Sequence, residues 1–161
     1  MNLMDRSTRE LLTLFGETLG ELRRRNVIRS NNNPVADYAE RIAADALGLT
    51  LVSRSTAGYD AIDTQGGRFE IKGRRRTPEN RSTQLSAIRG LDKNHFDFLI
   101  GILFEDDFSV QRACLVPIHV VRLVSAYRAH VNAWVLHLRD SLWEVDGVKD
   151  VTAEIRKAAG Q

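Results

Sequence analysis

Residues 58–76 have the sequence GYDAIDTQGGRFEIKGRRR, and this stretch decides our prediction of the fold. Two short apolar segments flank a pair of glycines at positions 66 and 67. Adjacent glycines supply the positive φ angles that a tight chain reversal needs. The stretch therefore predicts a β-hairpin that ends in three consecutive arginines.

The second strand of this hairpin carries two kinds of side chain. Phe69 and Ile71 alternate with Glu70 and Lys72, so the apolar pair can face a core while the charged pair shares the opposite face. An acid on the first strand would add a second carboxylate beside Glu70. Two such carboxylates can hold Mg²⁺ against a substrate phosphate, and a nearby lysine can orient or deprotonate water and offset charge on phosphate oxygens. The pattern predicts a metal-dependent site for phosphodiester hydrolysis.

The length of the hairpin loop decides which aspartate belongs to this site. A two-residue turn of the glycine pair would pair Asp63 with Glu70 and point Asp60 to the other face. A three-residue loop, 65–67, would instead pair Asp60 with Lys72 and place both on the face of Glu70. Strict alternation favours Asp63, and the spacing leaves both aspartates open as ligands.

The composition indicates one soluble domain. The chain has 161 residues, of which 43% are hydrophobic, which is enough to bury a core within a single domain spanning residues 1–161. No apolar run approaches the roughly 20 residues that span a bilayer, and residues 1–10 lack the apolar region of a signal peptide. We expect a cytoplasmic protein that does not bind membranes. The single cysteine, Cys114, lies in an apolar run and is predicted to be a core residue.

Basic residues are concentrated just after the hairpin turn. Residues 68–89 contain seven bases and two acids, although the whole chain has a formal net charge of only +2. A local surplus of positive charge beside candidate metal ligands favours a polyanionic substrate over a merely solvated surface. We therefore predict that Arg74, Arg75 and Arg76 contact a nucleic-acid backbone, which positions the substrate without reading its sequence.

Apolar spacing predicts two helices before the hairpin. The first lies within residues 5–27, with a buried stripe of Leu11, Phe15, Leu19 and Leu22. The second begins at Pro34 and ends near Gly48. Its polar residues, among them Asp37 and Glu40, are assigned to faces away from the core.

The remaining elements complete a mixed α/β order. Residues 49–53 and the hairpin supply three strands, residues 80–91 have the spacing of a short helix, and the apolar run 96–104 is typical of a strand covered on both faces. Further elements are predicted at 110–116 (strand), 117–129 (helix), 133–138 (strand) and 151–159 (helix). The sequence thus predicts an α/β fold with a core of helix, three strands, helix and strand, preceded by an N-terminal helix and followed by a C-terminal strand and helix extension.

This order of elements, with these charged residues on it, resembles the PD-(D/E)xK nuclease superfamily, which has the restriction-endonuclease-like fold. The resemblance covers about residues 34–104. The family has an acid at the start of the second core strand and a Glu-x-Lys motif in the third, and these correspond to Asp60, Glu70 and Lys72. Tyr59 stands where the family name has a proline. The resemblance favours Asp60 over Asp63 as the metal ligand.

Many members of that family also carry a glutamate in the first core helix and a glutamine in the second, and these resemble Glu40 and Gln84. The resemblance implies an endonuclease that depends on Mg²⁺ or Mn²⁺ and acts on duplex or branched DNA. Cutting both strands of a duplex often calls for two active sites and hence a homodimer. Asp60 and Glu70 would hold the metal, Lys72 would position water, Glu40 would assist and Gln84 would orient the site. The alternative is a catalytically inactive module of the same fold that binds nucleic acid or protein.

Overall fold

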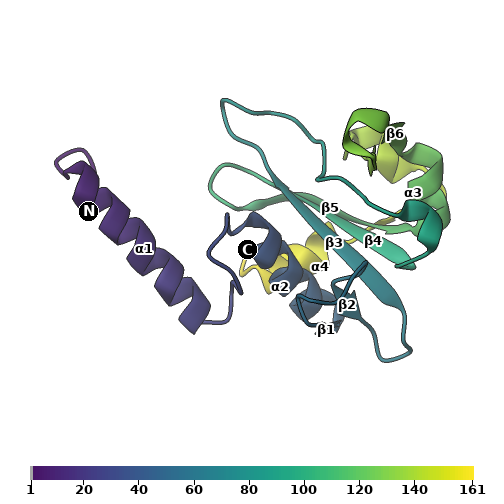
Figure 1. Ribbon diagram of the computed structural model, residues 1–161, viewed down its shortest axis with the longest axis horizontal. Helices are drawn as coiled ribbons and strands as arrows, with labels where there is room; N and C mark the ends of the chain where they lie inside the picture. Colours follow the sequence, from purple (N-terminus) through teal and green to yellow (C-terminus); the bar gives the residue numbers. More distant parts are fainter. Residues whose placement is uncertain (1) are drawn as a thin grey trace.

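The computed structural model describes residues 2–161 and shows a mixed α/β fold built on a six-stranded sheet (Figure 1). The α/β class predicted from the sequence is confirmed. The sheet has the order β1-β2-β3-β4-β5-β8, in which β3 and β4 are parallel and all other neighbours are antiparallel. Its strands are β1 (Thr50–Leu51), β2 (Ala61–Ile62), β3 (Arg68–Arg75), β4 (Phe98–Phe104), β5 (Val110–Pro117) and β8 (Lys149–Asp150).

Helices and a second, smaller sheet cover the two faces of this sheet. One face packs against α2 (Val35–Leu47) and α4 (Thr152–Ala158), which also contact each other. The other face packs against α3 (Ile118–Val124) and the two-stranded sheet of β6 (Ala126–Arg128) and β7 (Ala133–Val135). Three short 3-10 helices lie in the connections, at Leu91–Lys93, Ala129–Val131 and Asp140–Glu144.

The central strand β4 divides the hydrophobic core into two layers. Ile100, Ile102 and Phe104 pack under α2 and α4, whereas Leu99 and Leu103 pack on the opposite side. All five side chains are buried, which confirms the prediction of a strand covered on both faces. The sheet is therefore the middle layer of a three-layer arrangement.

Helix α2 begins and ends as its sequence predicts and lies close against β3. The side chain of Asn33 accepts a hydrogen bond from the Val35 backbone N–H (3.1 Å), and Gly48 ends the helix in the left-handed conformation. Gly73 allows the close approach, because a Cβ atom at this position would lie 2.9 Å from the Cβ of Ala39. This contact fixes α2 over the strand that carries Glu70 and Lys72.

Helix α1 (Thr8–Arg24) forms as predicted, but its apolar stripe is not buried. Ser7 and Glu10 form a capping box at its N-terminus. Figure 1 shows the helix standing apart from the rest of the molecule. Only Leu19 is buried, while Leu11 and Phe15 are 39% and 59% exposed, so the prediction of a buried stripe is wrong for most of its length.

The helix predicted at residues 80–91 does not form. The segment is extended instead, and the backbone N–H groups of Leu85 and Ile88 donate to the carbonyls of Leu136 and Trp134 (both 2.9 Å). Ser82 also competes with helix formation, because its hydroxyl accepts a hydrogen bond from the backbone N–H two residues later (3.1 Å). The crossover between the parallel strands β3 and β4 therefore contains no α-helix.

After β4, the predicted elements occur in the predicted order, but β6 and β8 are additional strands that were not predicted. The strand predicted at 110–116 and the helix at 151–159 are confirmed as β5 and α4. The helix predicted at 117–129 ends at Val124, because Tyr127 pairs with Trp134 in the β6-β7 sheet. That sheet accounts for only part of the strand predicted at 133–138. None of the helices within residues 2–161 has the length and apolar character needed to cross a bilayer.

Candidate functional site

The hairpin between β2 and β3 has neither of the two registers considered from the sequence. Ala61 pairs with Phe69, which leaves a five-residue loop at 63–67. Asp63 holds this loop, because its Oδ1 accepts hydrogen bonds from the backbone N–H groups of Gln65 and Gly67 (both 2.8 Å). The carboxylate of Asp63 therefore has a structural role in the turn.

Asp60 is held beside Glu70 by hydrogen bonds to Phe69 and Ile71, the two neighbours of Glu70 in the chain. The Asp60 backbone N–H donates to the carbonyl of Phe69 (2.8 Å), and its Oδ2 accepts from the backbone N–H of Ile71 (2.7 Å). Just before β2 begins, the Asp60 carboxylate thus accepts a hydrogen bond that a backbone carbonyl of a paired strand would otherwise accept. This arrangement positions Asp60, rather than Asp63, next to the charged pair of β3.

Glu70 and Lys72 contact each other on one face of β3. The Nζ of Lys72 lies 2.8 Å from Oε1 of Glu70, and the two side chains are only 10% and 17% exposed, respectively. Lys72 also donates to the hydroxyl of Ser86 on the β3-β4 crossover (3.3 Å). Lys72 therefore has a fixed orientation, because its side chain is nearly buried and its Nζ contacts both Glu70 and Ser86.

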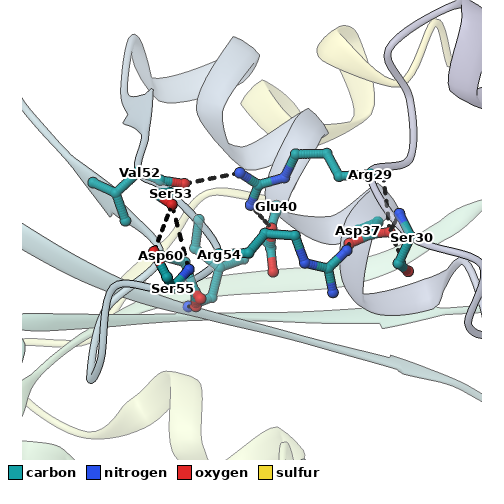
Figure 2. A network of polar contacts seen from close by, with 10 residues as sticks. Arg29, Ser30, Asp37, Glu40, Val52, Ser53, Arg54, Ser55 and Asp60 are labelled. Atoms are coloured by element: carbon teal, nitrogen blue, oxygen red, sulfur yellow. Dashed lines mark hydrogen bonds and ion pairs between the residues drawn. The ribbon is translucent and has the colours of Figure 1, made fainter.

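Glu40 reaches the same region from α2, paired with Arg29. Figure 2 shows the guanidinium of Arg29 between the Glu40 carboxylate and the backbone carbonyl of Val52, to which it donates a hydrogen bond of 2.8 Å. The side chain of Glu40 is 14% exposed. Val52 in turn donates its N–H to the carbonyl of Asp60 (2.9 Å), so this network ties α2 to the start of β2.

Asp37, one turn before Glu40, is buried, and its assignment to an outer face of the helix is wrong. Its Oδ2 accepts hydrogen bonds from the backbone N–H groups of Arg29 and Ser30 and from the Ser30 hydroxyl (2.7–2.9 Å). Arg54 approaches its Oδ1 at 3.4 Å (Figure 2). Burial raises the pKa of Asp37, but these contacts outweigh that effect and hold the pKa below its ordinary value. Asp37 thereby fixes the segment that carries Arg29.

Asp60 has the most perturbed carboxyl group of the site. Burial is the largest cause that raises its pKa, and the negative charges of Glu70 and Glu40 add to it. Against the opposing effects of the Ile71 N–H and Lys72, the pKa of Asp60 reaches about 7. Glu70 and Glu40 therefore both lie near enough to Asp60 to disfavour its ionised form. Such crowding of carboxylates is more typical of a functional site than of a solvated strand face.

The three arginines after Lys72 do not point in one direction. Arg74 and Arg76 alternate onto the face of Lys72, where Arg74 donates to the carbonyl of Ser82 (3.2 Å) and Arg76 to the side chain of Gln111 (2.9 Å). Arg75 lies on the other face. It forms an ion pair with Asp106 (2.7 Å) and stacks on the ring of Phe108, 4.5 Å from its centroid. All three are half-buried and already have partners within the protein.

Gln84 is placed differently from the other candidates. The helix expected to carry it is absent, its side chain is exposed, and its backbone forms a bridge with His137. The exposed arginines Arg81 and Arg89 lie on the same crossover, on either side of Ser86. The crossover therefore brings Ser86 to Lys72 and carries two solvent-accessible bases.

The donor set suits a hard divalent cation. Within the described residues, no group of three or more His, Cys, Asp or Glu side chains is arranged to hold a metal ion. Mg²⁺, however, keeps most of its waters and needs only one or two carboxylates in addition to substrate phosphates. Asp60 and Glu70 would supply these two carboxylates. Burial is the main cause that raises the pKa of Asp60, and a cation there would offset the second cause, which is repulsion by Glu70.

Several residues of the network could not be predicted from the sequence. Arg29, Ser30 and Arg54 come from loops, and their carboxylate partners lie 7 to 17 residues away across turns of unpredicted shape. Ser86 gave no signal because the crossover was expected to be helical. Compared with models of known protein families and with curated proteins, the chain gives no match.

Proposed function

We propose that this protein is a Mg²⁺-dependent DNA endonuclease whose site contains Asp60, Glu70 and Lys72. The observation that carries this proposal is the convergence of these three side chains from adjacent strands, with Glu40 of α2 beside them. The succession of α2, three antiparallel strands and a fourth strand parallel to the third also supports it. The extended crossover is a departure from the expected nuclease core.

Each residue has a role that follows from its chemistry and position. Asp60 and Glu70 would hold the cation, and Mn²⁺ would serve in place of Mg²⁺ because it accepts the same oxygen ligands. When bound, the metal polarises the phosphate and neutralises charge on its oxygens. Lys72, fixed by Glu70 and Ser86, orients the attacking water and offsets the charge that builds in the transition state.

Glu40 assists from the helix. Its carboxylate, oriented by Arg29, either contributes to metal binding or accepts the proton of the attacking water. Gln84 has no role in this proposal, because the helix that would have directed its side chain to the site does not form. The water oxygen bonds to phosphorus as the bond to the leaving oxygen breaks, which cuts the strand.

The surrounding charge favours DNA as the substrate. Arg74 and Arg76 share the face of Lys72, and the exposed Arg81 and Arg89 lie on the crossover whose Ser86 contacts Lys72. Basic side chains of this kind contact phosphates irrespective of base sequence. Duplex or branched DNA would therefore be bound through its backbone.

A non-catalytic binding module is the rival function, and one observation favours it. Glu70 is paired with Lys72 and Glu40 with Arg29, so both carboxylates already have cationic partners. Paired charges of this kind also occur in purely structural networks. The two functions differ in whether bound DNA is cut.

The test is a cleavage assay on supercoiled, linear and branched DNA with Mg²⁺ or Mn²⁺, with a chelator as control. The parent protein is expected to cut with either metal and to stop when the metal is removed. Lys72→Met, which keeps the aliphatic chain and removes the charge, is expected to bind DNA but to cut roughly 10² to 10³ times more slowly. Binding without cleavage by the parent under all these conditions would support the binding module instead.

A further inference from the structure

A second group of basic side chains surrounds a cavity near the end of β3 that lies away from Glu70. The cavity has a volume of about 350 Å³, and Leu103 and Leu138 form its apolar part. This volume falls within the roughly 300–1,000 Å³ of sites that bind small molecules. Its polar lining consists of Arg76, Thr83, Gln111, Arg112, Arg139 and Asp140.

The cavity is separate from the proposed metal site. Arg76 directly follows β3 and comes six residues after Glu70. Because a strand rises about 3.3 Å per residue, roughly 20 Å lie between their Cα atoms. Arg112, on β5, is the strand partner of Leu103 and reaches the cavity from the neighbouring strand. Among the described residues that line the cavity, none is a proposed metal ligand.

Neutral groups orient two of the three arginines. Arg76 donates a hydrogen bond to Oε1 of Gln111 (2.9 Å), and the guanidinium of Arg112 stacks on the ring of Trp143, 4.1 Å from its centroid. The Nε of Arg76 is buried and has no hydrogen-bond partner within residues 2–161. These contacts fix the guanidinium groups without cancelling their charge.

The lining has a net positive charge. Arg76, Arg112 and Arg139 contribute three positive charges and Asp140 one negative charge, which gives +2. Asp140 lies 3.0 Å from Arg112, but its side chain is 97% exposed, so solvent weakens this ion pair. Asp150 approaches Arg112 at 3.7 Å without lining the cavity. The cavity therefore favours an anion.

The charge of Arg139 also acts outside the cavity. Burial lowers the pKa of His137, and the positive charges of Arg139 and Arg128 lower it further. Arg139 is exposed at the cavity rim, so its guanidinium can turn toward a ligand.

This combination of size and charge suits one kind of phosphate. A guanidinium can donate two parallel hydrogen bonds to phosphate oxygens. A terminal phosphate carries a charge of about −1.5 to −2 at pH 7, which matches the lining, whereas a phosphodiester within DNA carries a single negative charge. A diester also continues on both sides, while a cavity of this size can receive an end.

We propose that this cavity binds a terminal phosphate group through Arg76, Arg112 and Arg139, with the Thr83 hydroxyl as a further donor. Such a group occurs on a free mononucleotide and at a phosphorylated end of a DNA strand. The inference does not depend on the proposed nuclease function, because binding can be measured without cleavage.

The first test is calorimetric titration of the full chain with inorganic phosphate and with a nucleoside 5′-monophosphate. Chelator is present, so that no metal can hold the phosphate at Asp60 and Glu70, and chloride keeps the ionic strength constant. The parent is expected to show saturable binding of both ligands. Arg139→Ala is expected to weaken it about tenfold or more, because a hydrogen-bonded charge is lost. Arg41→Ala removes the same charge from α2, on the other face of the sheet, and is expected to leave binding unchanged.

The neighbouring carboxylate gives a prediction of opposite sign. Asp140→Asn removes the one negative charge of the lining and is expected to tighten phosphate binding about threefold. Thermal unfolding without ligand would check that Arg139→Ala and Asp140→Asn fold as the parent does. Absence of saturable binding by the parent would overturn the proposal. Equal binding by Arg139→Ala and Arg41→Ala, or weaker binding by Asp140→Asn, would also contradict it.

A second titration distinguishes the two sources of the phosphate. Single-stranded oligonucleotides that carry a 5′ phosphate, a 3′ phosphate or neither are compared with the mononucleotide. A DNA end as ligand predicts that one phosphorylated oligonucleotide binds about tenfold or more tighter than the unphosphorylated one, and that Arg139→Ala removes this difference. A free nucleotide as ligand predicts tight binding of the mononucleotide alone. If the terminal phosphate changed the affinity of neither kind of ligand, the cavity would not be a site for it.

Discussion

Glu70 and Lys72 are in contact, but they have different roles in the proposed mechanism: Glu70 would bind the metal, and Lys72 would orient the attacking water. Replacing Glu70 with Ala removes an anionic ligand, so the affinity for Mg²⁺ is expected to fall about tenfold or more. Replacing Lys72 with Ala removes a positive charge next to the same ligand, so Mg²⁺ affinity is expected to stay the same or rise. Calorimetric titration of the two variants with Mg²⁺ measures this difference. Equal loss of Mg²⁺ affinity in both would indicate that the ion pair is only structural.

The contribution of Asp37 to stability can be tested by a single substitution. Its buried carboxylate accepts three hydrogen bonds, so Asp37→Asn is expected to lower the free energy of unfolding by about 1–3 kcal/mol at pH 7. The exposed Arg54 contributes little to this value, because its ion pair is screened by solvent.

The effect of Asp37 depends on pH in a defined direction. Its pKa is lowered in the folded state, so between the folded and unfolded pKa values the unfolded chain binds more protons and stability rises with pH. The difference between the parent and Asp37→Asn is therefore expected to be constant above about pH 5 and to shrink below about pH 4. Urea unfolding at several pH values tests this. A difference that persisted unchanged below pH 4 would show that the charge of Asp37 is not responsible.

Residue types and spacing were enough to predict the charged pair of β3, but not the length of the loop that precedes this strand. Alternation in the segment 69–72 predicted that Glu70 and Lys72 share a face, and their contact confirms it. The loop length could not be predicted, because the Asp63 carboxylate replaces backbone partners and widens the turn to five residues. An acid can serve as a metal ligand or as a turn residue, and only the structure distinguishes Asp63 from Asp60.

At the scale of elements, two of the helices were predicted well. The segments 34–48 and 151–159 form helices close to the expected bounds. The segment 80–91 has helical spacing of apolar residues, but it also has three hydroxyl side chains and finds backbone partners near β7. Tertiary hydrogen bonds of this kind override a weak helical tendency, and a single sequence does not reveal them.

The packing of α2 on β3 gives a prediction at this scale. A Cβ atom at position 73 would meet Ala39, Phe104 and the Val35 carbonyl within 3.1 Å. Gly73→Ala is therefore expected to lower the free energy of unfolding by about 1–3 kcal/mol, because helix and strand must separate. Urea denaturation would measure the loss.

A matched control for this substitution lies in α1. Gly16 has no atom within 4 Å of its would-be Cβ. Gly16→Ala is expected to leave stability unchanged or to raise it by up to about 1 kcal/mol, since alanine favours the helix. If both substitutions had the same effect, the close contact between α2 and β3 would not be the cause.

At the scale of the whole molecule, the uneven distribution of charge should govern DNA binding. The observed binding constant is expected to fall steeply with salt. The slope of log K against log salt concentration should be about −0.9 for each phosphate neutralised, because each contact releases counterions. Arg89→Ala is expected to reduce the magnitude of this salt slope by about 1 and to weaken binding similarly for all sequences. Arg41→Ala, an exposed arginine of α2 already paired with Asp45, serves as the control and should change neither. Affinity that is flat with salt would show that the basic segment is only a solvated surface.

Asp60, and not Asp63, is proposed to hold the catalytic metal. The decisive measurement is the single-turnover rate of DNA cleavage in Mg²⁺ for the parent, Asp60→Asn and Asp63→Asn. Asp60→Asn removes a charge next to Glu70 and is expected to slow cleavage by about 10²-fold or more. Asp63→Asn keeps the acceptor oxygen of the turn and is expected to cut within about threefold of the parent. Equal rates for the parent and Asp60→Asn, or a larger loss in Asp63→Asn, would contradict the proposed site.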